Sequence, residues 1–368
     1  MKRTSIRSMV APTAAVLALG LSLTACGAAN EAPTQAATKS KLSGTLNGAG
    51  SSAQEAAQGA WQAGFQTNNP GVTVNYDPVG SGGGREQFLS GGVQFAGSDS
   101  YLADDELASS KKACNGQAAL EVPDYVSPIA LVYNLPGVDN LQLSAKTAAG
   151  IFSGKITSWD DPAIKADNPG SKLPAQKIAP VHRSDESGTT DNFTQWLSAA
   201  GEGGWTAEPD SVWPTKGGEG AQGTSGVIDA VTNGKGTIGY ADESQAGDLS
   251  VAKIKVGSQY VAPSAEGAAK VVDISKPVSG RDASTDLAVD IDRTTTESGS
   301  YPLVLVSYLI ACPSYKDKAT ADLVKGYLSY IVGTSGQQAA AKTAGSAPLS
   351  NELSSKAGAV IDKITAKS

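Results

Sequence analysis

The sequence HRSDESGTTDNF at residues 182–193 places an arginine, several hydroxyls and a glycine directly before a helical pattern, Phe193–Leu197. Free N–H groups at a helix N-terminus point outward and carry partial positive charge, so they favour an anion. Ser187 and Thr189 add hydroxyl donors, and Arg183 adds a planar fork of donors that matches a tetrahedral oxyanion. The segment therefore indicates an anion site. A plain helix cap at Ser187 or Thr189 is the simpler alternative.

Three further loops are rich in small residues and follow predicted strands: Gly48–Ala53, Val79–Arg85 and Phe95–Asp99. The first fits the pattern G-x-G-x-x-G/A, which taken alone would also fit a dinucleotide site. The second fits a flexible turn equally well. Asp99 is unusual because it puts a carboxylate in a loop otherwise suited to anions, although a lone aspartate at a strand end is often a turn residue.

Strands and helices alternate along the rest of the chain. Strand patterns occupy residues 42–46, 72–76, 125–133, 178–181, 237–240 and 302–311, and helical patterns occupy 53–66, 85–89, 227–231, 318–333 and 336–343. This alternation favours an α/β sheet that binds ligands at the ends of its strands. A chain of 368 residues is long enough for two lobes with separate cores.

The N-terminus has the pattern of an exported lipoprotein. Residues 1–25 combine three cations with an apolar stretch that is short for a bilayer span, and they form a predicted signal peptide. The sequence LTAC at residues 23–26 resembles a bacterial lipobox, in which the cysteine, here Cys26, is lipidated and becomes the mature N-terminus. A plain signal peptide with an incidental cysteine is the alternative. Residues 26–43 read as a flexible tether.

The charge and the cysteine content of the chain exclude further classes of function. The formal net charge is −7, and loss of residues 1–25 with their three cations makes it −10, which argues against nucleic acid as a partner. His182 is the only histidine and no CxxC pair occurs, so we expect neither a metal site nor a cofactor. Cys114 and Cys312 remain in the exported chain and indicate one disulfide, with two buried free thiols as the alternative.

Together, these segments resemble the phosphate-binding lipoproteins of bacterial phosphate ABC importers, the PstS family. The resemblance covers nearly the whole mature chain and runs through residues 48–52, 80–83, 95–99, 154–162, 182–193, 236–240 and 347–349. It implies an α/β, two-lobed periplasmic-binding-protein-like fold of type II, with the ligand cleft between the lobes. We expect lobe one to comprise residues 44–124 and 302–368, and lobe two residues 125–301.

The resemblance also implies phosphate contacts from both lobes. They are Ser52, the Ala53 amide, Ser81 and Asp99 from lobe one, and Arg183, Ser187, Gly188 and Thr189 from lobe two. The first loop departs from the family, which often has Ala-Thr-Phe where this chain has Ser-Ser-Ala, so Ala53 can offer only its N–H. The family often has glycine at the position of Glu186. A carboxylate facing phosphate would repel it, so we expect Glu186 to point to solvent and Asp185 to pair with Arg183.

The sequence thus predicts a monomeric, non-enzymatic protein that captures inorganic phosphate and delivers it to the permease subunits of an ABC importer. Its predicted location is the extracytoplasmic face of the cell membrane, to which a lipid anchors it. One alternative is a binding protein for another oxyanion, such as sulfate, molybdate or a phosphonate. Asp99 disfavours fully deprotonated anions because a carboxylate can only accept hydrogen bonds. The other is a serine hydrolase or phosphatase using Ser187, His182 and Asp185, although Ser187 lacks the G-x-S-x-G setting.

Overall fold

The structure is a computed structural model that describes residues 42–367. These residues belong to one compact unit, Ser40–Ser368. The predicted signal peptide, Cys26 and the predicted tether up to residue 41 lie outside the described residues. Among residues 42–367, no helix has the length and apolar character needed to cross a membrane.

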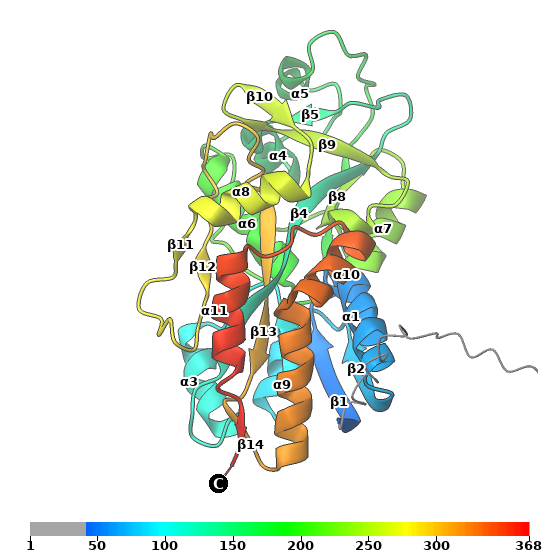
Figure 1. Cartoon of the computed structure of the whole chain (residues 1–368). Coiled ribbons are helices and arrows are strands. Elements are labelled where there is room, and N and C mark those ends of the chain that lie inside the picture. Colours follow the sequence, from blue (N-terminus) through cyan, green and yellow to red (C-terminus); the bar gives the residue numbers. More distant parts are fainter. Residues whose placement is uncertain (1–41, 368) are drawn as a thin grey trace, which may run out of the picture. The chain divides into compact units, whose positions relative to one another are not determined.

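One mixed sheet of eleven strands organises the described chain (Figure 1). β9 (Ser250–Val256) pairs with the central strand and carries two short strands, β5 (Gln142–Leu143) and β10 (Gln259–Val261). The main path runs in the order β2 (Gly71–Asp77), β1 (Ser43–Gly50), β3 (Phe95–Ser98), β13 (Val304–Ala311), β4 (Leu120–Asn134), β8 (Thr237–Asp242), β6 (Ala179–Arg183) and β7 (Glu219–Ala221).

β4 is the strand that links the two lobes. Its residues up to Pro128 pair antiparallel with β13, and its residues from Ile129 onward pair antiparallel with β8. Only β13 and β4 stand at the middle of the main path, with β1, β2 and β3 on one side and β6, β7 and β8 on the other. The predicted lobe boundary at residue 124 falls inside this strand and stays a prediction.

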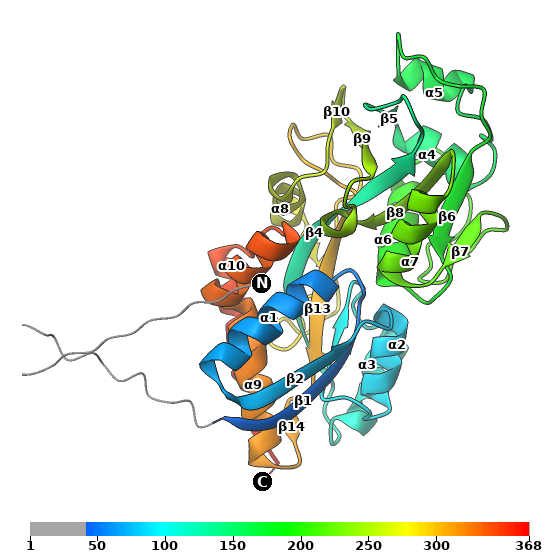
Figure 2. The same cartoon turned by 90° about the vertical axis from the view of Figure 1, so that its right-hand side faces the viewer.

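Helices cover both faces of the first-lobe part of the sheet (Figure 2). α1 (Glu55–Asn68), α9 (Lys318–Val332) and α10 (Thr334–Ala344) lie on one face, and α2 (Ser81–Leu89) and α3 (Asp104–Ala113) lie on the other. The remaining helices are α11 (Asn351–Ile361), which packs on α9, and α4 (Ala145–Phe152), α5 (Pro162–Asp167), α6 (Gly188–Ala200), α7 (Gly223–Asn233) and α8 (Ala265–Ile274) from the middle of the chain. Two small sheets complete the structure, β11 (Lys276–Pro277) with β12 (Val289–Asp290) and β14 (Ser314–Tyr315) with β15 (Thr365–Ala366).

Each lobe buries its own aromatic residues. In the first lobe Phe95 meets Tyr327 edge to face, with ring centroids 5.6 Å apart. In the second lobe Phe193 stacks on Tyr240 at 4.2 Å. Rings in such contact contribute stability beyond the area they bury. All four rings belong to one continuous cluster of buried residues, so the main core is shared by the lobes and is not divided into the separate cores expected from the sequence.

A disulfide joins Cys114 to Cys312, with their Cα atoms 5.0 Å apart. Cys114 directly follows α3 and Cys312 directly follows β13, so both cysteines lie in the first lobe. The bond spans 198 residues of sequence. It therefore connects the end of α3 to the end of β13.

The strands and helices expected from the sequence are all present, but β4, α7 and α2 each begin four or five residues earlier than expected. α2 begins at Ser81 and not at Arg85, so the glycine run that we expected to be a loop forms the first turns of a helix. Gly84 explains why glycine is used there. A Cβ at this position would lie 2.3 Å from the Cα of Gly50, so the helix can pack this closely on β1 only without a side chain.

Candidate functional site

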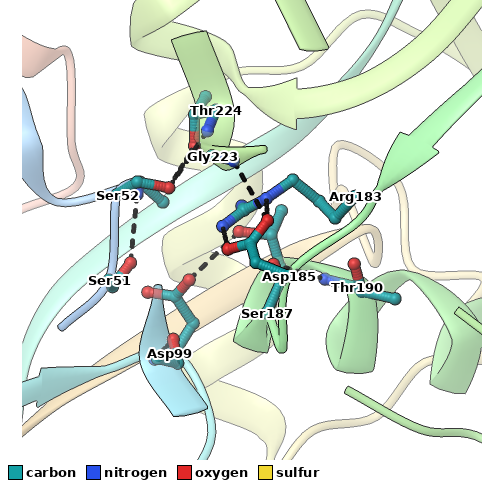
Figure 3. A network of polar contacts seen from close by, with 12 residues as sticks. Ser51, Ser52, Asp99, Arg183, Asp185, Ser187, Thr190, Gly223 and Thr224 are labelled. Carbon is teal, nitrogen blue, oxygen red and sulfur yellow. Dashed lines mark hydrogen bonds and ion pairs between the residues drawn. The ribbon is translucent and has the colours of Figure 1, made fainter. Parts of the chain in front are cut away.

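The ends of strands and the starts of helices bring the predicted anion-binding residues together (Figure 3). The N-termini of α2 and α6 meet at this point: a Cβ on Gly188 would lie 2.7 Å from Ser81 Oγ and 2.8 Å from Asp99 Cβ. A side chain at residue 188 would therefore push the lobes apart. Three strand ends contribute to the site: β1 is followed by Ser51 and Ser52, β3 by Asp99, and β6 by the turn 184–187. Three helix starts contribute as well, namely α2 at Ser81, α6 at Gly188 and α7 at Gly223.

Asp99 is the buried anion of the site, with 3% of its surface exposed. Thr189 Oγ1 donates to Asp99 Oδ2 at 3.1 Å, and the Ser307 hydroxyl donates to Oδ1. Burial raises the pKa of the Asp99 carboxyl. Hydrogen bonds from Ser307, Ser51 and Thr189 and the charge of Arg183 oppose that shift, in this order. The carboxylate is thus held by donors from both lobes.

Arg183 is the buried cation of the site and pairs with Asp185, as expected. Its Nε and Nη2 donate to the two carboxylate oxygens of Asp185 at 2.8 and 2.5 Å. Asp185 also accepts from the Gly223 N–H at 3.0 Å. Burial alone would raise the pKa of Asp185, but the hydrogen bond and charge of Arg183 outweigh it and lower the pKa. Nη1 of Arg183 has no hydrogen-bond partner among residues 42–367, so it remains for a ligand.

Several hydroxyls of the site accept backbone hydrogen bonds, which fixes their oxygens. Ser81 Oγ accepts from the Asp99 N–H at 3.1 Å, and Ser187 Oγ accepts from the Thr190 N–H at 3.2 Å. The hydroxyl proton of each serine stays free to donate to an anion. Ser187 is therefore a helix cap, as the simpler interpretation held, and still a candidate ligand donor.

The first loop differs in detail from the expectation. The Ala53 N–H donates to Ser51 Oγ at 3.0 Å, so a ligand would compete with this bond for the amide. Ser52 Oγ accepts from the Thr224 N–H at 3.1 Å and lies 3.0 Å from Thr224 Oγ1. Ser52 therefore binds the start of α7 directly and joins the first loop to the second lobe.

Sequence reasoning missed Thr224, Ser307 and Asn192. Thr224 stands in a Gly-Thr-Ser-Gly segment at a helix start, which is the same signal that identified Ser187. Ser307 is the one serine in the apolar strand Val304–Ala311, and this interruption of the apolar pattern marks it. Asn192 donates to the main-chain oxygens of Asp99 and Gly188 at 2.7 and 2.8 Å. Nothing in the sequence pattern distinguishes Asn192 from a surface residue.

The geometry of a serine hydrolase is not formed. The ring of His182 stacks on Trp213, with centroids 4.8 Å apart and an interplanar angle of 8°. Its Nδ1 lies 2.8 Å from the Arg183 carbonyl oxygen. Within residues 42–367, no hydrogen bond joins His182 to Ser187, so Ser187 has no adjacent base. No group of three or more His, Cys, Asp or Glu residues in the described part of the chain could hold a metal ion.

Comparisons with known proteins cover most of the chain. Residues 35–335 match the model of a family described as a PBP superfamily domain. The chain is 37% identical over 306 residues to phosphate-binding protein PstS 3 of Mycobacterium tuberculosis, covering 82% of this chain and 81% of that protein. It is 35% identical over 268 residues to phosphate-binding protein PstS of Xylella fastidiosa, covering 69% of this chain and 70% of that protein.

Solved structures share the fold at lower sequence identity. A high-affinity periplasmic phosphate-binding protein, PfluDING, solved with bound phosphate, superposes with a TM-score of 0.69 at 23% identity, covering 85% of this chain and 92% of that one. A phosphate-binding protein from Stenotrophomonas maltophilia superposes with a TM-score of 0.65 at 20% identity, covering 86% and 94%. The predicted α/β, two-lobed periplasmic-binding-protein-like fold is confirmed.

Proposed function

This chain belongs to the PstS family of phosphate-binding proteins, and from that membership we propose that it captures inorganic phosphate outside the cytoplasm and delivers it to an ABC importer. Its curated relatives are named as binding proteins, and the chain is proposed to have no catalytic activity. The ligand would lie between the lobes, where the predicted residues of both lobes converge.

The observation that carries this proposal is the buried Asp99 carboxylate beside Arg183 and several hydroxyl donors. Phosphate near neutral pH keeps at least one proton, whereas sulfate has none. An ionised carboxylate only accepts, so Asp99 can accept the O–H of phosphate, whereas sulfate would place an oxygen without a proton against the carboxylate, and the two would repel each other. Sites of this kind reject the wrong ligand by roughly 10⁴-fold or more.

The proposed ligand contacts have complementary roles. Nη1 of Arg183 and the hydroxyls of Ser81 and Ser187 would donate to oxygens that carry no proton. The backbone N–H groups at the start of α6 would add partial positive charge. The full proposed set is Ser52, the Ala53 amide, Ser81, Asp99, Arg183, Ser187, Gly188 and Thr189.

Delivery would use opening and closing of the lobes. The interlobe contacts Ser52–Thr224 and Thr189–Asp99 belong to a closed arrangement, and β4 crosses between the lobes. We expect phosphate to favour this closed state and the permease subunits to bind the protein in that state. We further propose that the protein is a monomer and that Cys26 carries the lipid anchor. A Cys26→Ala variant recovered in the membrane fraction would contradict that anchor.

Calorimetric titration of protein stripped of bound ligand tests the proposed function. Phosphate should bind with one-to-one stoichiometry, and sulfate should give no heat at millimolar concentration. Phosphate esters should be neither bound tightly nor hydrolysed. Tight sulfate binding would favour the alternative of another oxyanion, and release of phosphate from an ester would favour an enzyme.

A further inference from the structure

One ion pair crosses from the first lobe to the second beside the site. Arg85 Nη2 on α2 lies 2.7 Å from Glu186 Oε1, in the turn that precedes α6. The Arg85 side chain is 6% exposed, and the Glu186 side chain is 45% exposed. The expectation that Glu186 points to solvent was therefore incomplete, because its carboxylate lies at the surface but is bound by Arg85.

Arg85 is held in place by its own lobe. Its Nε donates to Glu106 Oε1 at 2.8 Å, and its Nη1 donates to Ser98 Oγ at 3.2 Å. Both partners belong to the first lobe, so the guanidinium is oriented before the second lobe arrives. Glu186 is the partner that comes from the other lobe.

Glu186 also contacts the first turn of α2 directly. Its carbonyl oxygen accepts from the Gly82 N–H at 3.1 Å. A Cβ on Gly82 would lie 2.3 Å from Glu186 Cδ, so the glutamate side chain occupies the space that glycine leaves open. Gly82 follows Ser81 and Glu186 precedes Ser187. Glu186 therefore joins two segments that each carry a proposed phosphate donor.

We propose that Glu186 is a positioning residue that slows phosphate release without touching the ligand. By binding Arg85 and the Gly82 N–H, it holds Ser81 and Ser187 together in the closed arrangement. The proposal rests on the proposed function, namely that phosphate binds between the lobes. Because the pair with Arg85 exists only when the lobes are together, its loss acts on dissociation, and the encounter with phosphate is unchanged.

The opposite effect would follow if Glu186 acted on phosphate only through its charge. A carboxylate near an anion repels it, so removal of the charge would then strengthen binding. The two accounts predict opposite effects on phosphate binding when the charge of Glu186 is removed. A substitution that keeps the shape of the side chain therefore distinguishes them.

The experiment measures phosphate association and dissociation rates by stopped flow on ligand-stripped full chain. Glu186→Gln keeps the side-chain shape and removes the charge. Glu106→Gln is the matched control, because it removes the charge of the other carboxylate that binds Arg85, within one lobe, while the amide oxygen can still accept the hydrogen bond that orients Arg85 Nε. Wild-type protein is measured first, since failure of wild type to bind phosphate contradicts the proposed function, whereas the comparison of variants judges only the role of Glu186.

For Glu186→Gln we expect phosphate to dissociate about two- to fivefold faster, which is the size of effect expected when a partly exposed ion pair is lost. The association rate should be unchanged. The difference from wild type should shrink in 1 M NaCl, because salt screens the pair. Glu106→Gln should dissociate at the wild-type rate. An unchanged or slower dissociation in Glu186→Gln, or an equal acceleration in both variants, would overturn the proposal.

Discussion

At the scale of single residues, the site combines a buried ion pair, Arg183 with Asp185, and a buried carboxylate, Asp99, with serine hydroxyls whose protons remain available. Arg183 is bound in two places by Asp185, which leaves one guanidinium nitrogen for a ligand. Asp99 receives hydroxyl donors from Thr189 and Ser307. The site is therefore pre-formed as a set of donors around one acceptor, and the identity of that acceptor decides which anion fits.

Exchange of Asp99 for asparagine tests that role. Asp99→Asn replaces an acceptor with a group that can also donate, so the proton of phosphate loses its best partner. We expect phosphate affinity to fall by about 1.5–3 kcal/mol and sulfate binding to become measurable at millimolar concentration by calorimetry. Asp77→Asn, at the exposed end of β2, is the control and should match wild type. If Asp99→Asn still ignores sulfate, selection by the proton of the ligand is wrong.

A second buried carboxylate makes stability depend on pH. Asp242, at the end of β8, accepts from the Tyr125 hydroxyl and the Ser244 N–H at 3.1 Å, and burial raises its pKa to about 7. In the unfolded chain its pKa is about 3.9. The folded protein thus binds more protons between these values, and the free energy of unfolding falls as pH rises towards 7. Above pH 7 the Asp242 carboxyl is charged in the folded protein, which then bears the full cost of burying that charge.

Asp242→Asn should remove the part of this pH dependence that Asp242 contributes, while that of other buried carboxyls such as Glu121 remains. We expect the ligand-free variant to gain melting temperature over wild type at pH 8 and to lose most of that advantage at pH 4.5. Thermal denaturation in phosphate-free buffers across this range is the measurement. Parallel pH profiles for the two proteins would show that Asp242 does not titrate as inferred.

At the scale of elements, two helical glycines differ in what surrounds them. A Cβ on Gly84 in α2 would lie 2.3 Å from the Cα of Gly50, whereas a Cβ on Gly59 in α1 would meet nothing within 4 Å. Gly84→Ala should therefore destabilise the protein by about 1–3 kcal/mol through forced separation of α2 from β1. Gly59→Ala should stabilise it by about 0.5–1 kcal/mol. Urea denaturation measures both, and equal effects of the two substitutions would contradict the packing argument.

The glycines of α2 also show what the sequence could and could not predict. Periodicity located the long strands and α9, because β13 and α9 bury continuous apolar faces. It missed α3, whose sequence DDELASSKKA buries only Ser110 and offers no apolar stripe. It placed the start of α2 late, because a glycine run has low helix propensity and only tight packing on β1 stabilises it.

The same limit applies to the site. Strand–loop–helix motifs located the segment 182–193 and the loops that hold Ser52, Ser81 and Asp99, and the family resemblance implied these three residues as ligand contacts. Ser307 and Thr224 reach the site through tertiary pairing, Ser307 on the strand β13 beside β3 and Thr224 opposite Ser52. Contacts between segments so distant in sequence leave no local pattern to detect.

At the scale of the whole molecule, closure around phosphate links binding to stability and size. A ligand that binds only the folded state adds about 4 kcal/mol at a thousandfold excess over Kd. Phosphate should raise the melting temperature by several degrees and shrink the radius of gyration in solution scattering, whereas sulfate should do neither. A melting temperature unmoved by millimolar phosphate, in stripped protein, would count against the closed complex.

The disulfide should stabilise the first lobe independently of the ligand. Closing a loop of 198 residues contributes up to about 5 kcal/mol in the chain-entropy model. We expect the double variant Cys114→Ser with Cys312→Ser to lose a large part of this amount in urea denaturation and to keep its phosphate affinity, because neither cysteine lies in the site. Intact mass of the wild type should rise by two hydrogens on reduction. A wild-type mass that does not change with reductant would exclude the bridge.

The place of β13 in the sheet has a consequence for biogenesis. β13 lies between β3 and β4 and pairs with both, yet β3 ends at Ser98 and β13 begins at Val304. A chain that leaves the ribosome or a translocation channel from its N-terminus therefore carries β3 with one edge unpaired until the sequence from Val304 onward has emerged. The middle of the chain can fold first, as an insertion between β4 and β13. The sheet of the first lobe is completed only when β13 pairs between β3 and β4, which emerged earlier.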